Sequence, residues 1–176
     1  MKLSWSHKLF FQTNRLVGKS AGFDALVKFF AKYALPILAV LVIWFLWWRY
    51  PQAPSLVLIF IWLPLLWLIG FGLSALIGLV YPHRRPNVEF PEIRRLITPL
   101  SDWKSLPSDH AFSAWLLVFA AWLTPNGGNL TTWPIIFFAL WATLICLARV
   151  LAGVHYPRDI IAGTALAWVV ALAFFR

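Results

Sequence analysis

Long apolar segments dominate this chain and leave few ways for it to fold. Five of them are candidate membrane spans by length and apolarity, at about residues 23–48, 56–81, 109–123, 132–151 and 157–175. Inside a bilayer every backbone N–H and C=O group needs an internal partner, which a helix supplies and an isolated strand does not. The sequence therefore predicts an all-α membrane protein, a polytopic bundle of about five transmembrane helices.

The composition supports one membrane-embedded unit. Hydrophobic residues make up 61% of the 176 residues and charged residues only 12%, which is not the composition of an ordinary soluble domain. We expect residues 1–176 to form a single integral-membrane domain. The one cysteine, Cys146, lies in an apolar segment, so the chain can form no internal disulfide.

The first 22 residues differ from the segments that follow, because basic and apolar residues are mixed there. This mixture is typical of a helix that lies in the membrane interface. The segment lacks the short apolar core and cleavage site of a signal peptide, so we expect it to be retained. Asp24 is the expected N-cap of the first span, and His7 has no evident partner.

Three short polar motifs interrupt the apolar sequence. They are His83-Arg84-Arg85-Pro86, Pro107-Ser108-Asp109-His110, and Arg149-x5-His155-x3-Asp159. Charged side chains at membrane depth are costly, and function is the usual reason to keep them. Because spans alternate in direction, all three motifs are expected on the same face of the membrane. The loop 82–108 is therefore the expected active-site loop.

The residue types in these motifs fit phosphate chemistry. Arg85 and Arg149 can supply forked guanidinium contacts, which match phosphate oxygens better than a lysine does. Ser108 and the backbone N–H groups near Asp109 stand where an expected helix begins, a position that favours anions. The sequence thus predicts a binding site for a phosphate group.

Two histidines and a carboxylate complete a set of residues for phosphoryl transfer. His155 and Asp159 are four residues apart and share a face if that stretch is helical. A carboxylate bound to one imidazole nitrogen fixes the tautomer and leaves the other nitrogen free to attack phosphorus. His110 then remains as the general acid for the leaving group.

These motifs resemble those of the type 2 phosphatidic acid phosphatase superfamily, in its membrane branch. The family pattern is Lys-x6-Arg-Pro, then Pro-Ser-Gly-His, then Ser-Arg-x5-His-x3-Asp. Here the three appear as Gly78…Arg85-Pro86, Pro107-Ser108-Asp109-His110 and Ala148-Arg149-x5-His155-x3-Asp159. The resemblance implies a metal-independent phosphatase without a cofactor.

The same resemblance implies a role for each matching residue. His155 is expected to form a phosphohistidine, Asp159 to orient it, and His110 to protonate the leaving group. The expected phosphate-binding residues are Arg84, Arg85, Ser108, Asp109 and Arg149.

Three positions depart from the family pattern. Gly78 stands in place of the lysine, so one phosphate cation is missing, and Arg84 or Lys104 could replace it. Ala148 removes a hydroxyl group from the third motif. Asp109 replaces a glycine and brings negative charge towards the phosphate unless its side chain points away.

The Pro-Ser-Asp-His form, the stretch from Tyr81 to Pro86 and the short five-span plan are most similar to the undecaprenyl-diphosphatase branch, of the bacitracin-resistance type. This resemblance implies hydrolysis of a polyprenyl (undecaprenyl) diphosphate to the monophosphate during cell-wall synthesis. It also implies a multi-pass protein of the bacterial cell (inner) membrane, with its site on the outer or periplasmic face. Most of the 15 lysines and arginines fall on the motif side, which by the positive-inside rule favours the cytoplasm. We expect the outer face.

Other functions stay open. The substrate could instead be phosphatidate or phosphatidylglycerophosphate, or the phosphoryl group could be transferred to another lipid. His110, His155 and Asp159 could ligate a metal, although nearby arginines would repel a cation. A net charge of +9 also suits a non-enzymatic protein that binds membrane lipids. Nucleic acid is not an expected partner, because the cations are spread along the spans, and the oligomeric state is open.

Overall fold

The computed structural model describes residues 3–49, 57–99, 102–123 and 133–175, which form helices and connecting loops and contain no strand. The helices are α1 (Trp5–Asn14), α2 (Ala21–Lys32), α3 (Ala34–Arg49), a π-helical turn (Leu58–Trp62), α5 (Leu63–Val80), α6 (Pro86–Glu89), α7 (Asp109–Leu123), α8 (Trp133–Leu151) and α9 (Pro157–Phe175). The prediction of an all-α fold is confirmed. The sequence also predicts a turn at residues 125–129, Pro-Asn-Gly-Gly-Asn. These residues lie outside the described ones.

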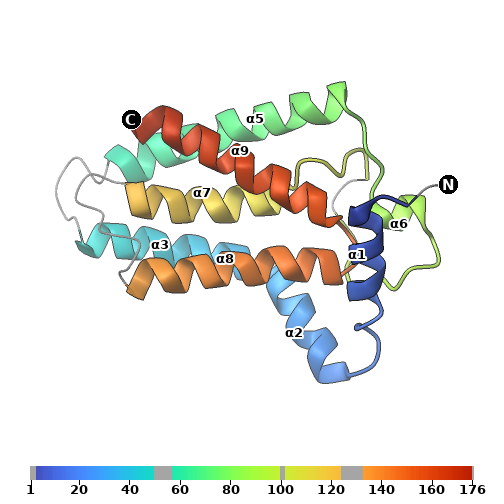
Figure 1. The fold of residues 1–176 in the computed structure, drawn as a ribbon. Coiled ribbons are helices and arrows are strands. Elements are labelled where there is room, and N and C mark those ends of the chain that lie inside the picture. The colour runs from blue at the N-terminus through green and yellow to red at the C-terminus, as the bar shows by residue number, and fades with distance from the viewer. Residues whose placement is uncertain (1–2, 50–56, 100–101, 124–132, 176) are drawn as a thin grey trace.

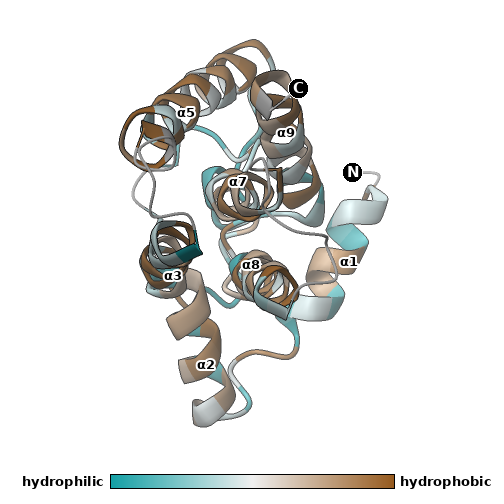
Figure 2. Cartoon of the chain, turned by 90° about the vertical axis from the view of Figure 1, so that its left-hand side faces the viewer, coloured by the Kyte–Doolittle hydropathy of each residue, from teal (hydrophilic) through white to brown (hydrophobic). Residues whose placement is uncertain are grey.

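Helix α7 lies in the middle of the bundle. It packs against α3, α5, α8 and α9, and Figure 2 shows these helices around it. With 15 residues α7 is about 22 Å long, which is shorter than the roughly 30 Å of a bilayer's hydrocarbon core. Because α7 is the central helix, the second polar motif, which precedes and opens it, lies near the centre of one end of the bundle.

The helices suit a membrane, but they do not fix the number of spans. Three are long and apolar enough to cross one, at Ile59–Val80, Trp133–Leu151 and Pro157–Phe174. The bent pair α2 and α3 makes a fourth candidate if it forms one broken span, and α7 is a shorter apolar helix. Figure 2 shows apolar residues on the outward faces of the long helices as well as between them, as expected for contact with lipid.

The expected first span is not one straight helix, so this prediction is wrong in detail. Helices α2 and α3 meet at Tyr33 with a bend of 54°. Pro36 explains the break, because a proline ring clashes with the carbonyl four residues earlier, here that of Lys32, and the proline has no N–H to donate. The bend leaves the carbonyl oxygen of Ala31 available to another helix.

The expected N-cap Asp24 is also wrong. Ser20 is the N-cap of α2, and its hydroxyl accepts a hydrogen bond from the N–H of Phe23 at 3.4 Å. The carboxylate of Asp24 instead accepts from the N–H of Gly18, at 2.9 and 3.0 Å. Ser20 takes the capping position because its extended backbone precedes the first helical residue.

Helix α1 lies across one end of the bundle (Figure 1), where it contacts α8 and α9. Phe10 of α1 is fully buried against Val150 and Tyr156. The expectation that His7 has no partner is wrong, because its Nδ1 accepts from the N–H of Ser4 at 3.1 Å and lies 2.6 Å from the hydroxyl of Ser4, while its Nε2 lies 3.6 Å from the carboxylate of Glu89. Ser4, the N-cap of α1, is a local partner, whereas the carboxylate of Glu89 lies far away in the sequence, where local reasoning could not find it. A location of residues 1–22 in the membrane interface stays a prediction.

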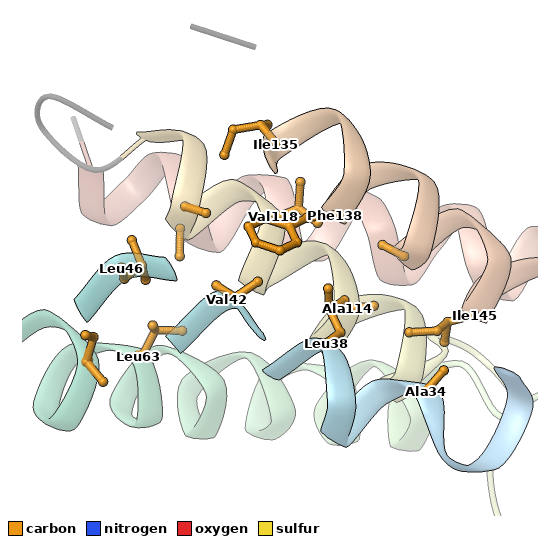
Figure 3. Packing of buried hydrophobic residues seen from close by; sticks show 14 residues of the cluster. Ala34, Leu38, Val42, Leu46, Leu63, Ala114, Val118, Ile135, Phe138 and Ile145 are labelled. Atoms are coloured by element: carbon orange, nitrogen blue, oxygen red, sulfur yellow. The ribbon is translucent and has the colours of Figure 1, made fainter. Parts of the chain in front are cut away.

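The largest buried cluster joins α3, α5, α7 and α8 (Figure 3). Helix α3 contributes Ala34, Leu38, Val42 and Leu46, all fully buried. Their spacing of four residues places them on one face of the helix, while Trp44 on the other side is exposed. This apolar core stabilises the packing of the four helices against one another.

Candidate active site

A cavity of about 1210 Å³ lies at the polar end of the bundle. Its walls come from α2, α3, α5, α7 and α8, from Arg85 before α6, and from the loops that precede α7 and α9. The cavity is lined by five of the predicted site residues: Arg85, Asp109, His110, Arg149 and His155. The structure therefore brings residues from all three polar motifs to one place.

Arg85 connects the first motif to the third. It stands at the N-cap of α6, where Pro86 opens the helix, and its side chain is buried. Its Nη1 donates to the carbonyl oxygen of Val154 at 3.1 Å and lies 3.0 Å from Nε2 of His155. Burial lowers the pKa of the Arg85 guanidinium from its ordinary value, while nearby carboxylates oppose this shift. A desolvated cation of this kind is stabilised by an anionic ligand.

The contact with Arg85 also defines the state of His155. A guanidinium group can only donate, so Nε2 of His155 is the acceptor and Nδ1 carries the proton. Nδ1 faces the carboxylate of Asp159, with 3.5 Å between Nδ1 and Oδ2, which is longer than an ordinary hydrogen bond. Burial, helped by the charges of Arg149 and Arg85, lowers the pKa of His155 to about 4, although Asp159 acts in the opposite direction. The ring is neutral at pH 7, with the lone pair of Nε2 unprotonated.

Asp159 is fixed by several hydrogen bonds. It is fully buried, and its Oδ2 accepts from the hydroxyl of Ser105 at 2.5 Å and from the N–H of Tyr156 at 2.8 Å. Its backbone carbonyl accepts from the N–H of Ser108 at 3.0 Å. Asp159 thus joins the second and third motifs. Nothing in the sequence points to Ser105, because a lone loop serine resembles any other.

Arg149 comes from the last turn of α8 and is also buried. Its Nη1 donates to the carbonyl oxygen of Ala31 at 2.9 Å, which is the carbonyl beside the bend between α2 and α3. Within the described part of the chain, the Nε atoms of both Arg149 and Arg85 are buried without a hydrogen-bond partner. Buried donors of this kind need an acceptor, and an anion beside both guanidinium groups would supply it.

A tight turn after α8 brings His155 to the site. Gly153 has a φ of 82°, in the left-handed region that glycine adopts without strain. A Cβ atom at this position would lie only 2.7 Å from the carbonyl oxygen of Arg94. His155 follows the turn and precedes α9, so it is not helical, although its contact with Asp159 forms as the spacing suggested.

The other predicted phosphate-binding residues occupy different places. Arg84 is exposed, and among the described residues neither it nor Ser108 lines the cavity. The hydroxyl of Ser108 is buried and accepts from the N–H of Ala111 at 3.5 Å. Asp109 lines the cavity, but its Oδ1 accepts from Lys104 and Ser74, both at 2.6 Å. Direct phosphate contacts by Arg84, Ser108 and Asp109 stay predictions.

The residues around the cavity fit an anion better than a metal ion. In the described ranges no group of three or more His, Cys, Asp or Glu side chains is arranged to hold a metal. The guanidinium groups of Arg85 and Arg149 would repel a cation placed beside His155. Two cations and an unprotonated imidazole instead suit a ligand with several negative oxygens.

A helical membrane bundle with such a cavity belongs to a class of enzymes that act on phosphate-bearing substrates. The chain is a member of the PAP2 superfamily, whose family model matches residues 73–176 and so includes all three motifs. Members of this family are phosphatases, which supports a phosphoric-ester hydrolase. The resemblance inferred from the motifs is confirmed.

Several known proteins are similar to this chain. Undecaprenyl-diphosphatase BcrC of Bacillus subtilis (strain 168) is 28% identical over 171 residues, which are 97% of this chain and 83% of that protein. Phosphatidylglycerophosphatase B of Haemophilus influenzae is 35% identical over 75 residues, which are 40% of this chain and 31% of that protein. The crystal structure of Aquifex aeolicus LpxE has a TM-score of 0.70 and 20% sequence identity, and the match covers 98% of this chain and 95% of that one. This last likeness shows a shared fold.

Proposed function

We propose that the chain is a membrane lipid phosphatase that hydrolyses a polyprenyl diphosphate, such as undecaprenyl diphosphate, to the monophosphate and inorganic phosphate. The observation that carries the proposal is the contact between Arg85 and His155, which pairs a phosphate-binding group with an unprotonated imidazole nitrogen. The similarity to the Bacillus subtilis diphosphatase over 97% of the chain supports this substrate class.

The first half of the reaction forms a phosphohistidine. The terminal phosphate binds beside Arg85 and Arg149, and its oxygens take over the guanidinium donors that now contact Nε2 or lack a partner. Nε2 of His155 then attacks phosphorus, a P–N bond forms, and the P–O bond to the lipid phosphate breaks. His110, which lines the same cavity, donates a proton to the leaving oxygen.

The second half releases inorganic phosphate. Water attacks the phosphorus of the phosphohistidine, and His110 accepts a proton from this water. The P–N bond breaks, the electron pair returns to Nε2, and both histidines regain their starting states. Throughout the cycle Asp159 holds the proton-bearing side of the ring and offsets the positive charge that develops on it.

The cavity walls fit a lipid substrate. Beside its charged residues the cavity is lined by apolar side chains from two helices, Leu35 at the start of α3 and Trp67 and Phe71 of α5. In Figure 2 helices α3 and α5 lie apart on the left of the view, with α7 to the right of both. The polyprenyl tail leaves the cavity between these two helices and enters the bilayer, while the diphosphate stays at the polar end.

The same proposal sets the organisation in the membrane. Residues 1–176 form one integral-membrane domain, with residues 1–22 in the interface and residues 82–108 as the active-site loop. The chain resides in a bacterial cell (inner) membrane as a multi-pass protein, with its cavity on the outer face. Bacterial relatives and the apolar helices support the membrane location.

A second candidate substrate is phosphatidylglycerophosphate. It is favoured by the relative from Haemophilus influenzae, whose identity of 35% exceeds that of the diphosphatase but extends over only 40% of this chain. Hydrolysis of this monoester would use the same nucleophile, His155, and the same general acid, His110.

The test is phosphate release by the purified chain in detergent, with excess EDTA and with either undecaprenyl diphosphate or phosphatidylglycerophosphate. We expect release from the diphosphate to survive EDTA, to be lost in His155→Ala, and to be kept in the control His83→Ala. An acid-labile phosphoryl label on the wild-type chain, absent from His155→Ala, would identify the intermediate. Release only from the monoester would select the second candidate, and release abolished by EDTA would overturn the histidine mechanism in favour of a metal.

A further inference from the structure

Lys104 is a buried cation in the cavity whose role the proposed mechanism leaves open. It lies in the loop between α6 and α7, is only 3% exposed, and lines the cavity together with Arg85 and Arg149. Its Nζ donates to the hydroxyl of Ser74 at 2.5 Å and to the carboxylate of Asp109 at 2.6 Å. An ammonium group has three N–H donors, so these two bonds leave one for a further acceptor.

Ser74 and Asp109 hold this ammonium group from two helices. The hydroxyl of Ser74, on α5, itself donates to Oδ1 of Asp109 at 2.6 Å, so the three side chains form a closed triangle. Asp109 opens α7 directly before His110. The triangle therefore holds Nζ of Lys104 at the start of α7, on the wall of the cavity that His110 also lines.

Gly78 makes room for the side chain of Lys104. A Cβ atom at position 78 would lie 2.7 Å from Cδ and 3.2 Å from Cβ of Lys104, and 3.2 Å from the ring of Trp103. Real Cβ atoms do not approach another carbon to 2.7 Å, because the repulsion at that distance is strong. A larger residue at position 78 would push the lysine side chain out of its place.

This packing accounts for two departures from the family pattern at once. The pattern has a lysine where this chain has Gly78, and a glycine where this chain has Asp109. In this chain Lys104 supplies the cation. Its side chain packs against Gly78, and its ammonium group donates to the carboxylate of Asp109. One rearrangement of the charges explains both differences.

We propose that Lys104 is a phosphate-binding residue, which donates its remaining N–H group to the substrate phosphate, with Ser74 and Asp109 as positioning residues. The proposal rests on the phosphatase function proposed above. It assigns Gly78 a steric role that no other residue type could fill while Lys104 keeps its position.

The test measures phosphate binding rather than turnover, so that it does not depend on which lipid is the substrate. The full chain in detergent is titrated with inorganic phosphate, and the thermal unfolding midpoint is followed as a function of its concentration. We expect Lys104→Met to raise the dissociation constant about 10- to 100-fold, the range for loss of a hydrogen bond to a charged group. Lys19→Met, which changes an exposed lysine outside the cavity lining, should bind phosphate as the wild type does.

Two further variants keep the result interpretable. If Lys104→Met does not fold because Asp109 loses its partner, Lys104→Met combined with Asp109→Asn removes both charges together. Gly78→Ala should weaken phosphate binding in the wild-type background and have no further effect in the Lys104→Met background, which is the non-additivity expected of a shared mechanism.

The outcomes separate this proposal from the proposed function. A folded Lys104→Met variant that binds phosphate as tightly as the wild type overturns the role of Lys104, even where lipid hydrolysis is established. Additive effects of Gly78→Ala and Lys104→Met overturn the steric role of Gly78. Weakened phosphate binding in a chain that hydrolyses neither lipid supports the assignment of Lys104 while the proposed function fails. A wild type without saturable phosphate binding overturns the assignment of Lys104, whereas the assay of lipid hydrolysis decides the proposed function separately.

Discussion

The guanidinium group of Arg85 lies 3.0 Å from Nε2 of His155, although the two residues are 70 positions apart in the sequence. The contact joins the loop before α6 to the turn between α8 and α9. It directs the lone pair of the proposed nucleophile at the group that is proposed to bind the phosphate. An incoming phosphate that replaces Nε2 at this guanidinium would arrive next to the nitrogen that attacks it.

Replacing Arg85 by lysine should not preserve activity. The guanidinium contacts both Val154 and His155 and keeps a further buried donor, whereas a single ammonium group cannot match this fork. We expect kcat/KM for the lipid diphosphate to fall about 100-fold or more in Arg85→Lys. Arg15→Lys, an exposed change in the N-terminal segment, is the matched control. A lysine variant within a few-fold of the wild type would contradict the role of the fork.

Replacing Asp159 by asparagine should lower turnover more than removing a partner of Asp159 does. The carboxylate faces Nδ1 of His155 and accepts from Ser105 and Tyr156. Asparagine keeps the shape but loses the charge that stabilises the phosphorylated ring, so we expect kcat to fall by a factor on the order of 100 to 10,000. Ser105→Ala removes one neutral donor and should cost about tenfold or less. Steady-state kinetics compare the loss of kcat in the two variants. A larger loss in Ser105→Ala than in Asp159→Asn would refute the role of the Asp159 charge.

The pH dependence of stability should reveal the neutral state of His155. In the unfolded chain the imidazole takes up a proton below about pH 6.5, whereas folded His155, with its pKa lowered to about 4, does not. Between these values acid therefore favours unfolding, by about 1.4 kcal/mol per pH unit and roughly 3 kcal/mol in total. The unfolding midpoint of the wild type should drop more steeply from pH 7 to pH 4.5 than that of His155→Gln. Parallel curves would show that the burial of His155 does not set its protonation.

The contact between α1 and the residue after His155 should matter for both stability and turnover. The hydroxyl of Tyr156 donates to Glu89 at 2.7 Å, and its ring packs on His7 with 4.8 Å between centroids. Burial, with help from Glu89, raises the pKa of Tyr156 above its ordinary value, so the phenol remains a donor at any working pH.

We expect Tyr156→Phe to lose about 1 to 2 kcal/mol of stability and to lower kcat several-fold, because the turn that carries His155 loses an anchor. Thermal unfolding and kinetics on the same preparation measure both effects. Tyr81→Phe, at an exposed tyrosine outside the cavity lining, is the control. Equal behaviour of the two variants would mean that α1 does not support the site.

The sequence predicted the elements whose signals are local. Apolar length places a helix at residues 157–175, and α9 has these bounds. The spacing of His155 and Asp159 predicts their proximity, which the structure has at 3.5 Å. The three motifs also carry the family resemblance that the match over residues 73–176 confirms.

Other local predictions failed where a competing feature lay close by. Pro36 divides the expected first span, and Ser20 caps α2 in place of Asp24. Both residues were visible in the sequence. Apolar length alone does not show which of two nearby signals prevails, because a proline interrupts a helix locally and two residues close together can both act as an N-cap.

The sequence alone determined the membrane-suited helices, the family and the reactive residue types, because hydrophobic length and motif spacing are properties of neighbouring residues. Only the tertiary structure decided that Ser105 supports Asp159, that His7 has a partner in Glu89, and that Lys104 occupies the space above Gly78. These contacts join residues that are distant along the chain. They form because helix packing excludes lipid and water from the polar end, where each buried polar group must find a partner.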